Sequence, residues 1–262
     1  MRILVANDDG IYSPGIAALA RVASRFGDVR VVAPDVEQSS ASHAVTASRP
    51  LTYHPATYLA EFDAYRVNGT PADCVALGIH HWSDVDIVLS GINLGVNMGN
   101  GLWHSGTLAA AKQATLFGIR GIAFSTPSGA RDRREPDFDA LEPHVARVLE
   151  VLLEERSAML LNVNVPADPR GMTWTRQAVR HYDGRIVPDE DPMGREHYWF
   201  TVKPIERTEP GTDLWAMERG YISVTPLTLD LTHHEELARL RERLPLDEPP
   251  GDSTGEEMNE DE

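Results

Sequence analysis

The amino-acid sequence predicts an α/β protein with three layers, in which helices cover both faces of a parallel sheet, and a C-terminal extension of a β-hairpin and a helix. Short apolar runs typical of buried strands alternate with segments of helical periodicity along the first 166 residues. The first 34 residues alone follow the order strand, helix, strand, which implies a right-handed crossover between parallel strands. Beyond residue 166 aromatic and β-branched segments replace this alternation.

The opening strand–helix–strand unit has clear boundaries. Arg2–Ala6 is a continuous apolar run after one charge, and it predicts a buried strand. Ser13 is a suitable N-cap and Pro14 a suitable first helical residue, so we expect a helix over 14–26. A second strand follows at Val29–Ala33, where Pro34 ends it.

The rest of the core continues the alternation. Thr70, Pro71 and Asp73 form a capping-box pattern at the start of a helix that we expect to run to His81. The other expected strands are 51–53, 64–67, 86–89, 119–125 and 159–163, and the other expected helices are 105–117 and 138–154.

The C-terminal part has a different character. We expect strands at 173–179, 185–187 and 197–202 to form hairpins that leave the main sheet, followed by a helix at 213–219, a strand at 221–224 and a terminal helix at 232–243. We therefore divide the chain into a catalytic core (1–166), an oligomerisation extension (167–246) and a disordered acidic tail (247–262). The tail carries eight acidic residues and no basic one.

Composition excludes several classes of protein. The 262 residues carry a net charge of −16, which disfavours binding to a nucleic-acid duplex or an anionic membrane. No apolar run approaches the length of a membrane span, and the N-terminus lacks a signal-peptide pattern. The single cysteine, Cys74, cannot form an internal disulfide. These features favour a cytoplasmic protein.

Polar clusters follow several of the expected strands. Open parallel sheets bind their ligands beyond the carboxyl ends of the strands, so these clusters are candidate site residues. Asp8 and Asp9 come directly after the first strand, and adjacent carboxylates repel each other unless a cation lies between them. Together with an amide oxygen such as that of Asn93 and a hydroxyl, they make an all-oxygen ligand set suited to Mg²⁺ or Mn²⁺. The alternative is that the two aspartates only cap the following helix.

A second cluster, Ser105, Gly106 and Thr107, opens a helix whose unpaired N–H groups and dipole favour an anion such as phosphate. A plain Ser/Thr N-cap is the alternative interpretation. Neither a GxGxxG motif after the first strand nor a P-loop motif is present, so the sequence gives little support for dinucleotide binding or NTPase chemistry.

Five motifs in this order resemble the SurE family of stationary-phase survival phosphatases. They are NDDG at 7–10, VAPD at 32–35, GTPADC at 69–74, SGIN at 90–93 with GxN at 95–97, and SGT at 105–107. The resemblance implies a Rossmann-like core and a metal-dependent phosphatase that hydrolyses nucleoside 5′- and 3′-monophosphates. It also implies a homodimer or homotetramer assembled through the C-terminal region.

The resemblance further implies a set of site residues. One divalent ion per subunit, Mg²⁺ or Mn²⁺, would be held by Asp8, Asp9, Ser39 and Asn93. Ser40 stands where the family usually has glycine, so either serine remains a candidate for the hydroxyl ligand. The phosphate contacts of the family correspond to a second set: Asn97, Ser105, Gly106 and Thr107.

The roles that we expect in catalysis follow from these positions. Asp8 or Asp9 orients or deprotonates the attacking water. His104 beside the phosphate site is a candidate general acid for the leaving ribose oxygen, although a packing role fits it equally, and His43 is a weaker candidate. Nothing in the sequence selects a base, although Tyr12 and Trp103 have rings that could stack on one.

Two rival functions remain at this point. A phosphatase with an aspartyl-phosphate intermediate, of the haloacid-dehalogenase type, needs an acid two residues after its nucleophile, but here the two aspartates are adjacent and position 10 is glycine. The other rival is a non-catalytic nucleotide-binding stress protein. A complete set of metal ligands argues against it, because binding phosphate alone does not require one.

Overall fold

The structure is a computed structural model that describes residues 1–128, 136–179, 184–202 and 208–244. The chain divides into two compact units, Met1–Leu229 and a second that begins at Asp230. The first unit contains the two sheets and the helices that cover the larger one, and the second contains a single helix in its described part.

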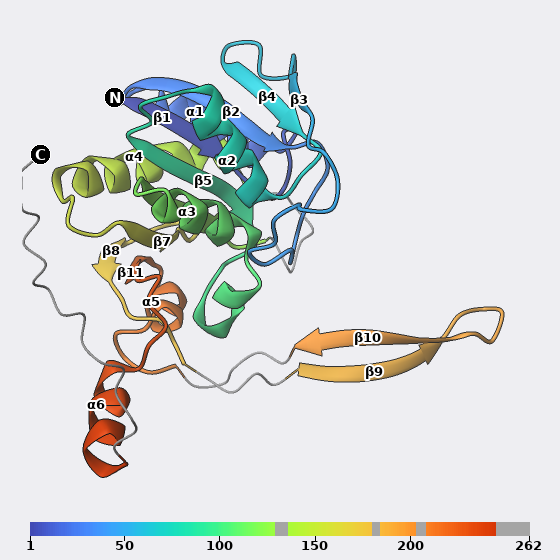
Figure 1. The fold of residues 1–262 in the computed structure, drawn as a ribbon, viewed down its shortest axis with the longest axis vertical. Coiled ribbons are helices and arrows are strands. Elements are labelled where there is room, and N and C mark those ends of the chain that lie inside the picture. The colour runs from blue at the N-terminus through green and yellow to red at the C-terminus, as the bar shows by residue number, and fades with distance from the viewer. Residues whose placement is uncertain (129–135, 180–183, 203–207, 245–262) are drawn as a thin grey trace, which may run out of the picture. The chain divides into compact units, whose positions relative to one another are not determined.

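Nine strands form the main sheet in the order β3-β4-β2-β1-β5-β6-β7-β11-β8 (Figure 1). Its strands are β1 (Arg2–Ala6), β2 (Asp28–Pro34), β3 (Tyr53–Pro55), β4 (Asp63–Val67), β5 (Ile87–Leu94), β6 (Arg120–Thr126), β7 (Leu160–Asn164), β8 (Gly171–Trp174) and β11 (Tyr221–Leu227). The helices of this unit are α1 (Pro14–Ala23), α2 (Pro71–His81), α3 (Gly106–Leu116), α4 (Phe138–Glu154), α5 (Asp213–Glu218) and the 3-10 helix η1 (Gly99–Trp103).

The order of the strands reverses at β1. From β1 the chain moves to β2 on one side, and later to β5, β6 and β7 on the other, all parallel to β1. In an open parallel sheet the crevice at such a switch point, beyond the carboxyl ends of the strands, is the usual place for a ligand. Here that point lies between the ends of β1 and β5.

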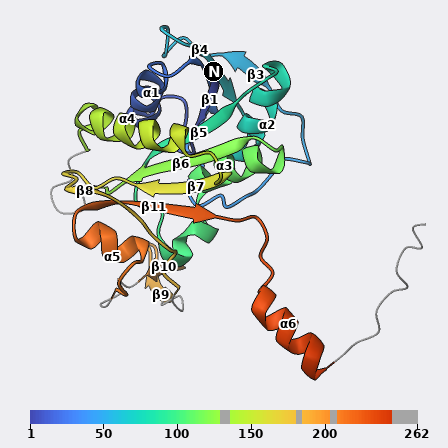
Figure 2. The same cartoon turned by 90° about the vertical axis from the view of Figure 1, so that its left-hand side faces the viewer.

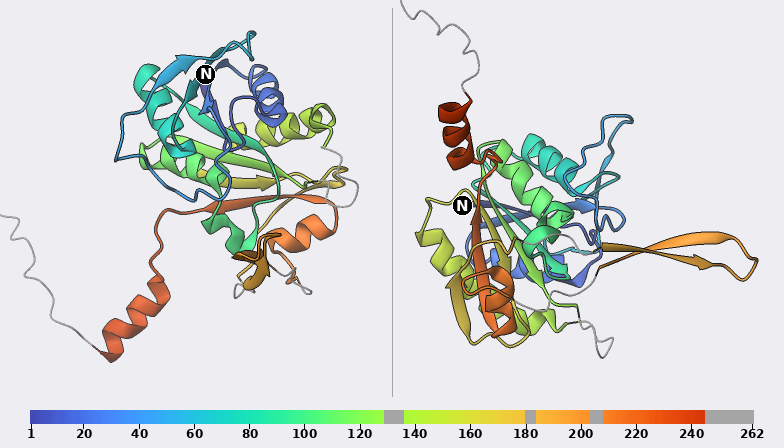
Figure 3. Two further views of the ribbon diagram at one scale, coloured as in Figure 1. Left: turned by 90° about the vertical axis from the view of Figure 1, so that its right-hand side faces the viewer. Right: turned by 90° about the horizontal axis from the view of Figure 1, so that it is seen from below.

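Alternate residues of the central strands separate the two helical layers. Ile3 and Val5 of β1 pack into a cluster with α1 and α4, whereas Leu4 and Ala6 pack with α2 and α3. Figure 2 shows α1 and α4 on one side of the sheet and α2 and α3 on the other, and Figure 3 shows the same layers from two further sides. The three-layer α/β architecture predicted from the sequence is thus confirmed.

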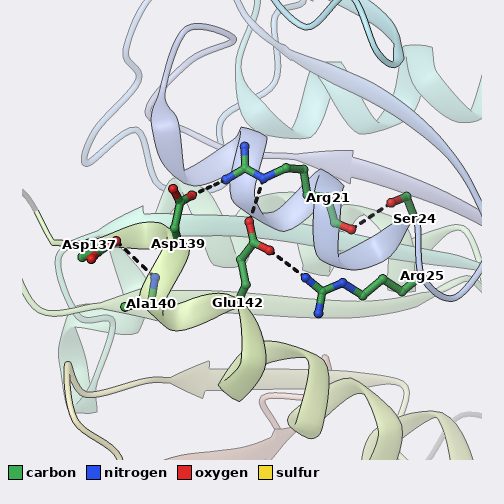
Figure 4. A network of polar contacts seen from close by, with 7 residues as sticks. All are labelled: Arg21, Ser24, Arg25, Asp137, Asp139, Ala140 and Glu142. Carbon is green, nitrogen blue, oxygen red and sulfur yellow. Dashed lines mark hydrogen bonds and ion pairs between the residues drawn. The ribbon is translucent and has the colours of Figure 1, made fainter.

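A network of ion pairs links α1 to α4 (Figure 4). The Nε atom of Arg21 donates to Glu142 Oε1 at 2.7 Å, its Nη2 atom to Asp139 Oδ1 at 2.6 Å, and Arg25 Nη2 to Glu142 Oε2 at 2.7 Å. Glu142 is mostly buried and receives both guanidinium groups. The network adds polar contacts between two helices that also share the larger hydrophobic cluster.

The predicted caps are present. The hydroxyl oxygen of Ser13 accepts from the backbone N–H of Ile16, with Pro14 in the first turn of α1. Thr70 and Asp73 form the reciprocal capping box of α2. Because cap and side-chain signals are local, these boundaries follow from a few neighbouring residues.

Strand β5 is longer than predicted. We expected it to end at residue 89, before the polar cluster at 90–97, but the strand continues through Leu94. Its ladder with β6 shifts register between Ser90 and Asn93 and then resumes at Asn93↔Ser125. Ser90 to Asn93 are all buried and belong to the strand, although polar residues and glycine are not typical of a buried strand.

The extension departs from the prediction in one respect. We expected the strand at 173–179 to leave the main sheet, and this is wrong: β8 pairs in parallel with β11, and β11 pairs antiparallel with β7. Both faces of β11 are buried, which gives it the environment of an inner strand. The main sheet therefore continues past residue 166, and the assignment of a separate oligomerisation role to 167–246 stays a prediction.

The predicted hairpin is present as a separate two-stranded sheet. Strands β9 (Gly184–Glu190) and β10 (Glu196–Val202) pair antiparallel with each other. Ile186, Tyr198 and Trp199 expose more than half of their surface.

The second unit contains α6 (His234–Arg243) in its described part. Leu237, Leu240 and Leu244 are exposed. The acidic tail at 247–262 lies outside the described residues, so its predicted disorder stays a prediction. Among the residues that the structure describes, no helix is both long and apolar enough to span a membrane.

Candidate active site

The predicted site residues gather at the switch point of the sheet. Asp8 and Asp9 follow β1, Asn93 is near the end of β5, and Ser105 to Thr107 begin α3. Asn7 shapes the turn after β1, because its side chain donates to the carbonyl oxygen of Gly10 at 2.9 Å and accepts from its N–H at 3.2 Å. Gly10 has a φ of +93°, a conformation that glycine adopts without strain.

Asp8 is buried against the N-terminus of α3. Its side-chain Oδ1 accepts a hydrogen bond from Thr107 Oγ1 at 2.7 Å, and its backbone oxygen accepts from the N–H of Gln38 at 2.7 Å. A Cβ added to Gly106 would lie 2.8 Å from the Cβ of Asp8 and 2.9 Å from its Oδ2. Only glycine allows this close approach of carboxylate and helix.

Asp9 is tied to the other side of the switch point. Its Oδ2 accepts from the backbone N–H of Leu94 at 3.1 Å, at the end of β5. The two adjacent carboxylates are therefore held by different elements, Asp8 by α3 and Asp9 by β5. Both elements flank the crevice in which we expect the ligand.

Burial raises the pKa of Asp8 to about 6, and the neighbouring charge of Asp9 adds to this effect, whereas the hydrogen bond from Thr107 opposes it. Burial likewise raises the pKa of Asp9, and the negative charge of Glu37 acts in the same direction. Two carboxyl groups that are costly to ionise thus lie side by side. A bound cation would remove this cost.

Asn93 is well placed for a ligand role, whereas Ser39 is less so. Asn93 is buried, and its Nδ2 donates to the carbonyl oxygen of Gly95 at 2.6 Å, which leaves the amide oxygen as the end suited to a cation. Ser39 lies on the exposed loop after β2, and its hydroxyl donates to Glu37 Oε1 at 2.6 Å. The backbone of this loop reaches Asp8 through Gln38. Ser39 as a metal ligand stays a prediction.

The expected phosphate residues surround the same point. Ser105 caps α3 by accepting from the N–H of Leu108 at 3.0 Å, so its hydroxyl proton can still be donated. Thr107 is fully buried and donates its proton to Asp8. Asn97 Nδ2 donates to Thr107 Oγ1 at 3.3 Å and to Ser125 Oγ at 2.9 Å. A continuous chain of hydrogen bonds thus joins Asn97 to Asp8.

The two candidate histidines differ in their surroundings. His104 is exposed and directly precedes the cap of α3, and its backbone oxygen accepts from the N–H of Ser42 at 3.1 Å. His43 Nε2 lies 2.9 Å from Gln113 Oε1, on the outer part of α3. His43 as a weaker candidate for the general acid stays a prediction.

Sequence reasoning missed four residues of this region. Glu37 lies close enough to Asp9 to raise its pKa. Ser125 of β6 and Asn162 and Asn164 of β7 are buried side chains that contact Asn97. Polar residues at the carboxyl end of a buried strand were the available signal, since LNVN at 161–164 interrupts an apolar run.

A pocket of about 510 Å³ lies elsewhere on the molecule. Its lining includes Asp86, Ile87 and Arg120, which are at the amino ends of β5 and β6. The candidate site is at the opposite, carboxyl ends of these strands, where α/β sheets bind their ligands. We therefore assign the chemistry to the aspartate cluster and not to this pocket.

The residues at the switch point fit a divalent cation of the Mg²⁺ type. Of the residues that the structure describes, no Lys, Arg or His forms an ion pair with Asp8 or Asp9, although both carboxyl groups are largely buried. Within the same part of the chain, no group of three His, Cys, Asp or Glu side chains could hold a metal. A site here therefore depends on amide and hydroxyl oxygens beside the two carboxylates, which suits a hard cation.

Comparisons with known proteins agree with this geometry. The chain is 48% identical over 248 residues to "5′-nucleotidase SurE 1" of Thermus thermophilus, which covers 92% of this chain and 96% of that protein. It is 42% identical to "5′-nucleotidase SurE" of Deinococcus radiodurans, with 93% of each chain covered. The crystal structure of the SurE protein from Aquifex aeolicus superposes with a TM-score of 0.79 at 37% identity, covering 93% of this chain and 99% of that one. Residues 3–184 match the family described as Survival protein SurE, and the chain therefore belongs to the SurE family.

Proposed function

We propose that this protein is a metal-dependent 5′-nucleotidase that hydrolyses nucleoside 5′-monophosphates, and also 3′-monophosphates, to nucleoside and phosphate. The observation that carries the proposal is the pair of largely buried carboxylates, Asp8 and Asp9, beside the N-terminus of α3. The names of the curated relatives, each a 5′-nucleotidase, support the same activity and argue against a nucleotide-binding protein without turnover.

The metal site that we propose holds one Mg²⁺ or Mn²⁺ per subunit with Asp8, Asp9, Asn93 and Ser39. When bound, the ion would supply a Lewis acid for a phosphoryl oxygen and lower the pKa of a water molecule. Burial and the neighbouring negative charges raise the pKa of both Asp8 and Asp9, so a bound cation would stabilise their ionised forms. The pair of carboxylates therefore favours the binding of a cation.

The phosphoryl group would lie against α3 and Asn97. The helix N-terminus offers unpaired N–H groups, and Ser105 retains a hydroxyl proton beyond its capping bond. Gly106 allows the carboxylate of Asp8 to pack directly against this helix N-terminus. In this arrangement the hydroxyl proton of Thr107 is donated to the carboxylate of Asp8.

Proton transfer would use the aspartates and His104. One of the two carboxylates accepts or orients the proton of the attacking water, and the sequence and contacts leave both as candidates for this role. His104 is exposed and directly precedes Ser105, the cap of α3, and it is the general acid that we propose for the leaving ribose oxygen.

Phosphate release from AMP or GMP in the presence of Mn²⁺ tests this function. A nucleotidase releases inorganic phosphate and loses this activity in the Asp9→Asn variant, whereas Asp28→Asn, an exposed aspartate at the start of β2, serves as the matched control. A protein that binds AMP by calorimetry but releases no phosphate with Mn²⁺ or Mg²⁺ would instead be the non-catalytic nucleotide-binding protein.

We propose that the protein assembles as a homodimer or homotetramer and that it is located in the cytoplasm. Two exposed leucines on α6, a third at its C-cap, and the exposed Tyr198 and Trp199 of the β9–β10 hairpin form apolar surfaces that a second copy would cover. The one cysteine, Cys74, is a buried free thiol, which is consistent with a reducing compartment.

A further inference from the structure

Two buried asparagines at the end of β7 contact one residue of the loop that follows β5. Asn162 and Asn164 are fully buried, and the side chains of both donate to the backbone oxygen of Asn97, at 2.8 and 2.9 Å. Asn164 also accepts from the backbone N–H of Asn97 at 2.9 Å through its Oδ1. One side-chain amide therefore satisfies both main-chain groups of Asn97, as a neighbouring strand would.

We propose that Asn164, assisted by Asn162, is a positioning residue that holds Asn97 in the geometry needed to bind the phosphoryl group of the substrate. The inference rests on the proposed function, in which Asn97 is a phosphate contact. Asn164 itself acts through Asn97 and is not expected to touch substrate.

The side chain of Asn97 has little freedom once its backbone is fixed. Its Nδ2 donates to Ser125 on β6 at 2.9 Å and, over a longer distance of 3.3 Å, to Thr107 on α3, which in turn donates to Asp8. The longer of the two bonds is the one that a phosphoryl oxygen would replace, because the backbone N–H of Asn97 is donated to Asn164. Ser125 lies directly across from Asn164 in the ladder between β6 and β7. Asn97 is thus held by β6, β7 and α3 together.

Asn97 lies in the loop that follows β5, and its backbone is no longer part of that strand. Gly95 and Gly99 on either side of Asn97 both have positive φ, and their N–H groups bond to Thr126 and Asp213. These bonds fix the two ends of the loop. The backbone of Asn97, between them, is bonded by the two asparagines of β7, and without them its polar groups would lack these partners.

The test compares Asn164→Ala with a matched control in the same sheet. Thr225 of β11 is equally buried, and its hydroxyl pairs with Thr175 at 2.8 Å and not with Asn97. For each variant we would measure KM and kcat for AMP, the inhibition constant of inorganic phosphate, the dissociation constant of Mn²⁺ by calorimetry, and the Tm.

Asn164→Ala should raise KM and the inhibition constant of phosphate by about 10- to 100-fold, the scale expected when a binding group is misplaced by about 1 Å. The Mn²⁺ dissociation constant should change less than about twofold, because Thr107 keeps its own hydrogen bond to Asp8 in this variant. Thr225→Val should lower the Tm with KM unchanged, and Asn164→Asp, which keeps the acceptor but loses the donor, should behave like the alanine variant.

An Asn164→Ala protein that is folded, with KM and phosphate affinity within about twofold of wild type, would overturn the proposal. If that variant does not fold, Asn162→Ala removes only one of the two donors to the Asn97 oxygen and should give a smaller increase in the same two constants; no increase there would also overturn it. Failure of the wild-type protein to release phosphate from AMP is a separate result, which rejects the proposed function. Phosphate binding measured by calorimetry would still test the positioning role of Asn164 in that case.

Discussion

Thr107 Oγ1 donates a hydrogen bond to Asp8 Oδ1 over 2.7 Å, and both side chains are buried. The first residue belongs to α3 and the second to the turn after β1, so this bond joins the expected phosphate-binding helix to the expected metal-binding carboxylate. The same hydroxyl accepts from Asn97, which leaves its one proton directed to Asp8. Thr107 therefore favours the ionised form of Asp8, the form that a cation needs.

Thr107→Val removes this bond at nearly constant volume. Hydrogen bonds to charged groups contribute about 1.5–3 kcal/mol, so the metal concentration for half-maximal activity should rise by about 10- to 100-fold. A titration of AMP hydrolysis with Mn²⁺ measures this change. Thr115→Val on the same helix, where the hydroxyl bonds to the carbonyl oxygen of Ala111, is the control and should keep the wild-type midpoint. Equal midpoints for the two variants would contradict the role of Thr107.

Asp8→Asn should stabilise the metal-free protein at pH 7. The folded state raises the pKa of Asp8 from 3.8 to about 6, so the folded protein retains a proton that the unfolded chain loses between these values, and stability falls as the pH rises through this window. This shift corresponds to a loss of folding stability of about 3 kcal/mol at pH 7, and the uncharged asparagine does not cause this loss.

Thermal denaturation in EDTA at pH 4 and pH 7 checks this prediction. The variant should have the higher Tm at pH 7, and the difference should become small near pH 4, which is close to the pKa of 3.8 in the unfolded chain and below the folded value of about 6. Added Mn²⁺ should raise the Tm of the wild type and not that of the variant. A variant that is less stable than wild type at pH 7 without metal would show that burial does not penalise the charge of Asp8.

Gly106→Ala should lower activity without unfolding the protein. The added Cβ would meet Asp8 at 2.8–2.9 Å, so the carboxylate or the helix must move. Alanine otherwise favours a helix more than glycine does, so a weaker helix would not explain a loss of activity. Gly101→Ala in η1, where an added Cβ meets nothing within 4 Å, is the control. AMP hydrolysis by the two variants should differ by at least about 10-fold, on the scale of a roughly 1 Å misplacement; similar rates would contradict the close-packing argument.

The protein should be larger than a monomer in solution. The chain has a mass of 28.9 kDa, and light scattering at micromolar concentration should give two or four times this value. Replacing Leu237 and Leu240 of α6, both exposed, by serine should lower the measured mass if this helix takes part in assembly. A wild-type mass near that of one chain would refute the oligomer.

Much of the fold was predictable because its signals are local. The apolar run Arg2–Ala6, the Ser13 cap and the Thr70–Asp73 capping box each depend on a few adjacent residues. The end of β5 was not predictable in this way, because the strand resumes its pairing with β6 after a register shift. The place of β8 in the main sheet was also missed, since β8 is joined to that sheet only through β11, some fifty residues later in the chain.

The candidate site shows the same limit. Asp8, Asp9, Asn93, Asn97 and the start of α3 come from recognisable motifs at strand and helix ends, and the structure brings them together at one switch point. The contacts of Asn162 and Asn164 with Asn97 cross 65 and 67 residues of sequence. Only the strand order, which places β7 beside β6 and β6 beside β5, puts these asparagines next to the loop.

Removal and return of the metal tests the central claim most directly. We would treat the wild-type protein with EDTA, remove the chelator, and follow phosphate release from AMP as Mn²⁺ or Mg²⁺ is added back, with Asp8→Asn and Asp9→Asn in parallel. The account predicts no release after chelation, full recovery with either ion in the wild type, and almost no recovery in both variants. Phosphate release that survives chelation, or a variant that recovers wild-type turnover at low metal concentration, would contradict it.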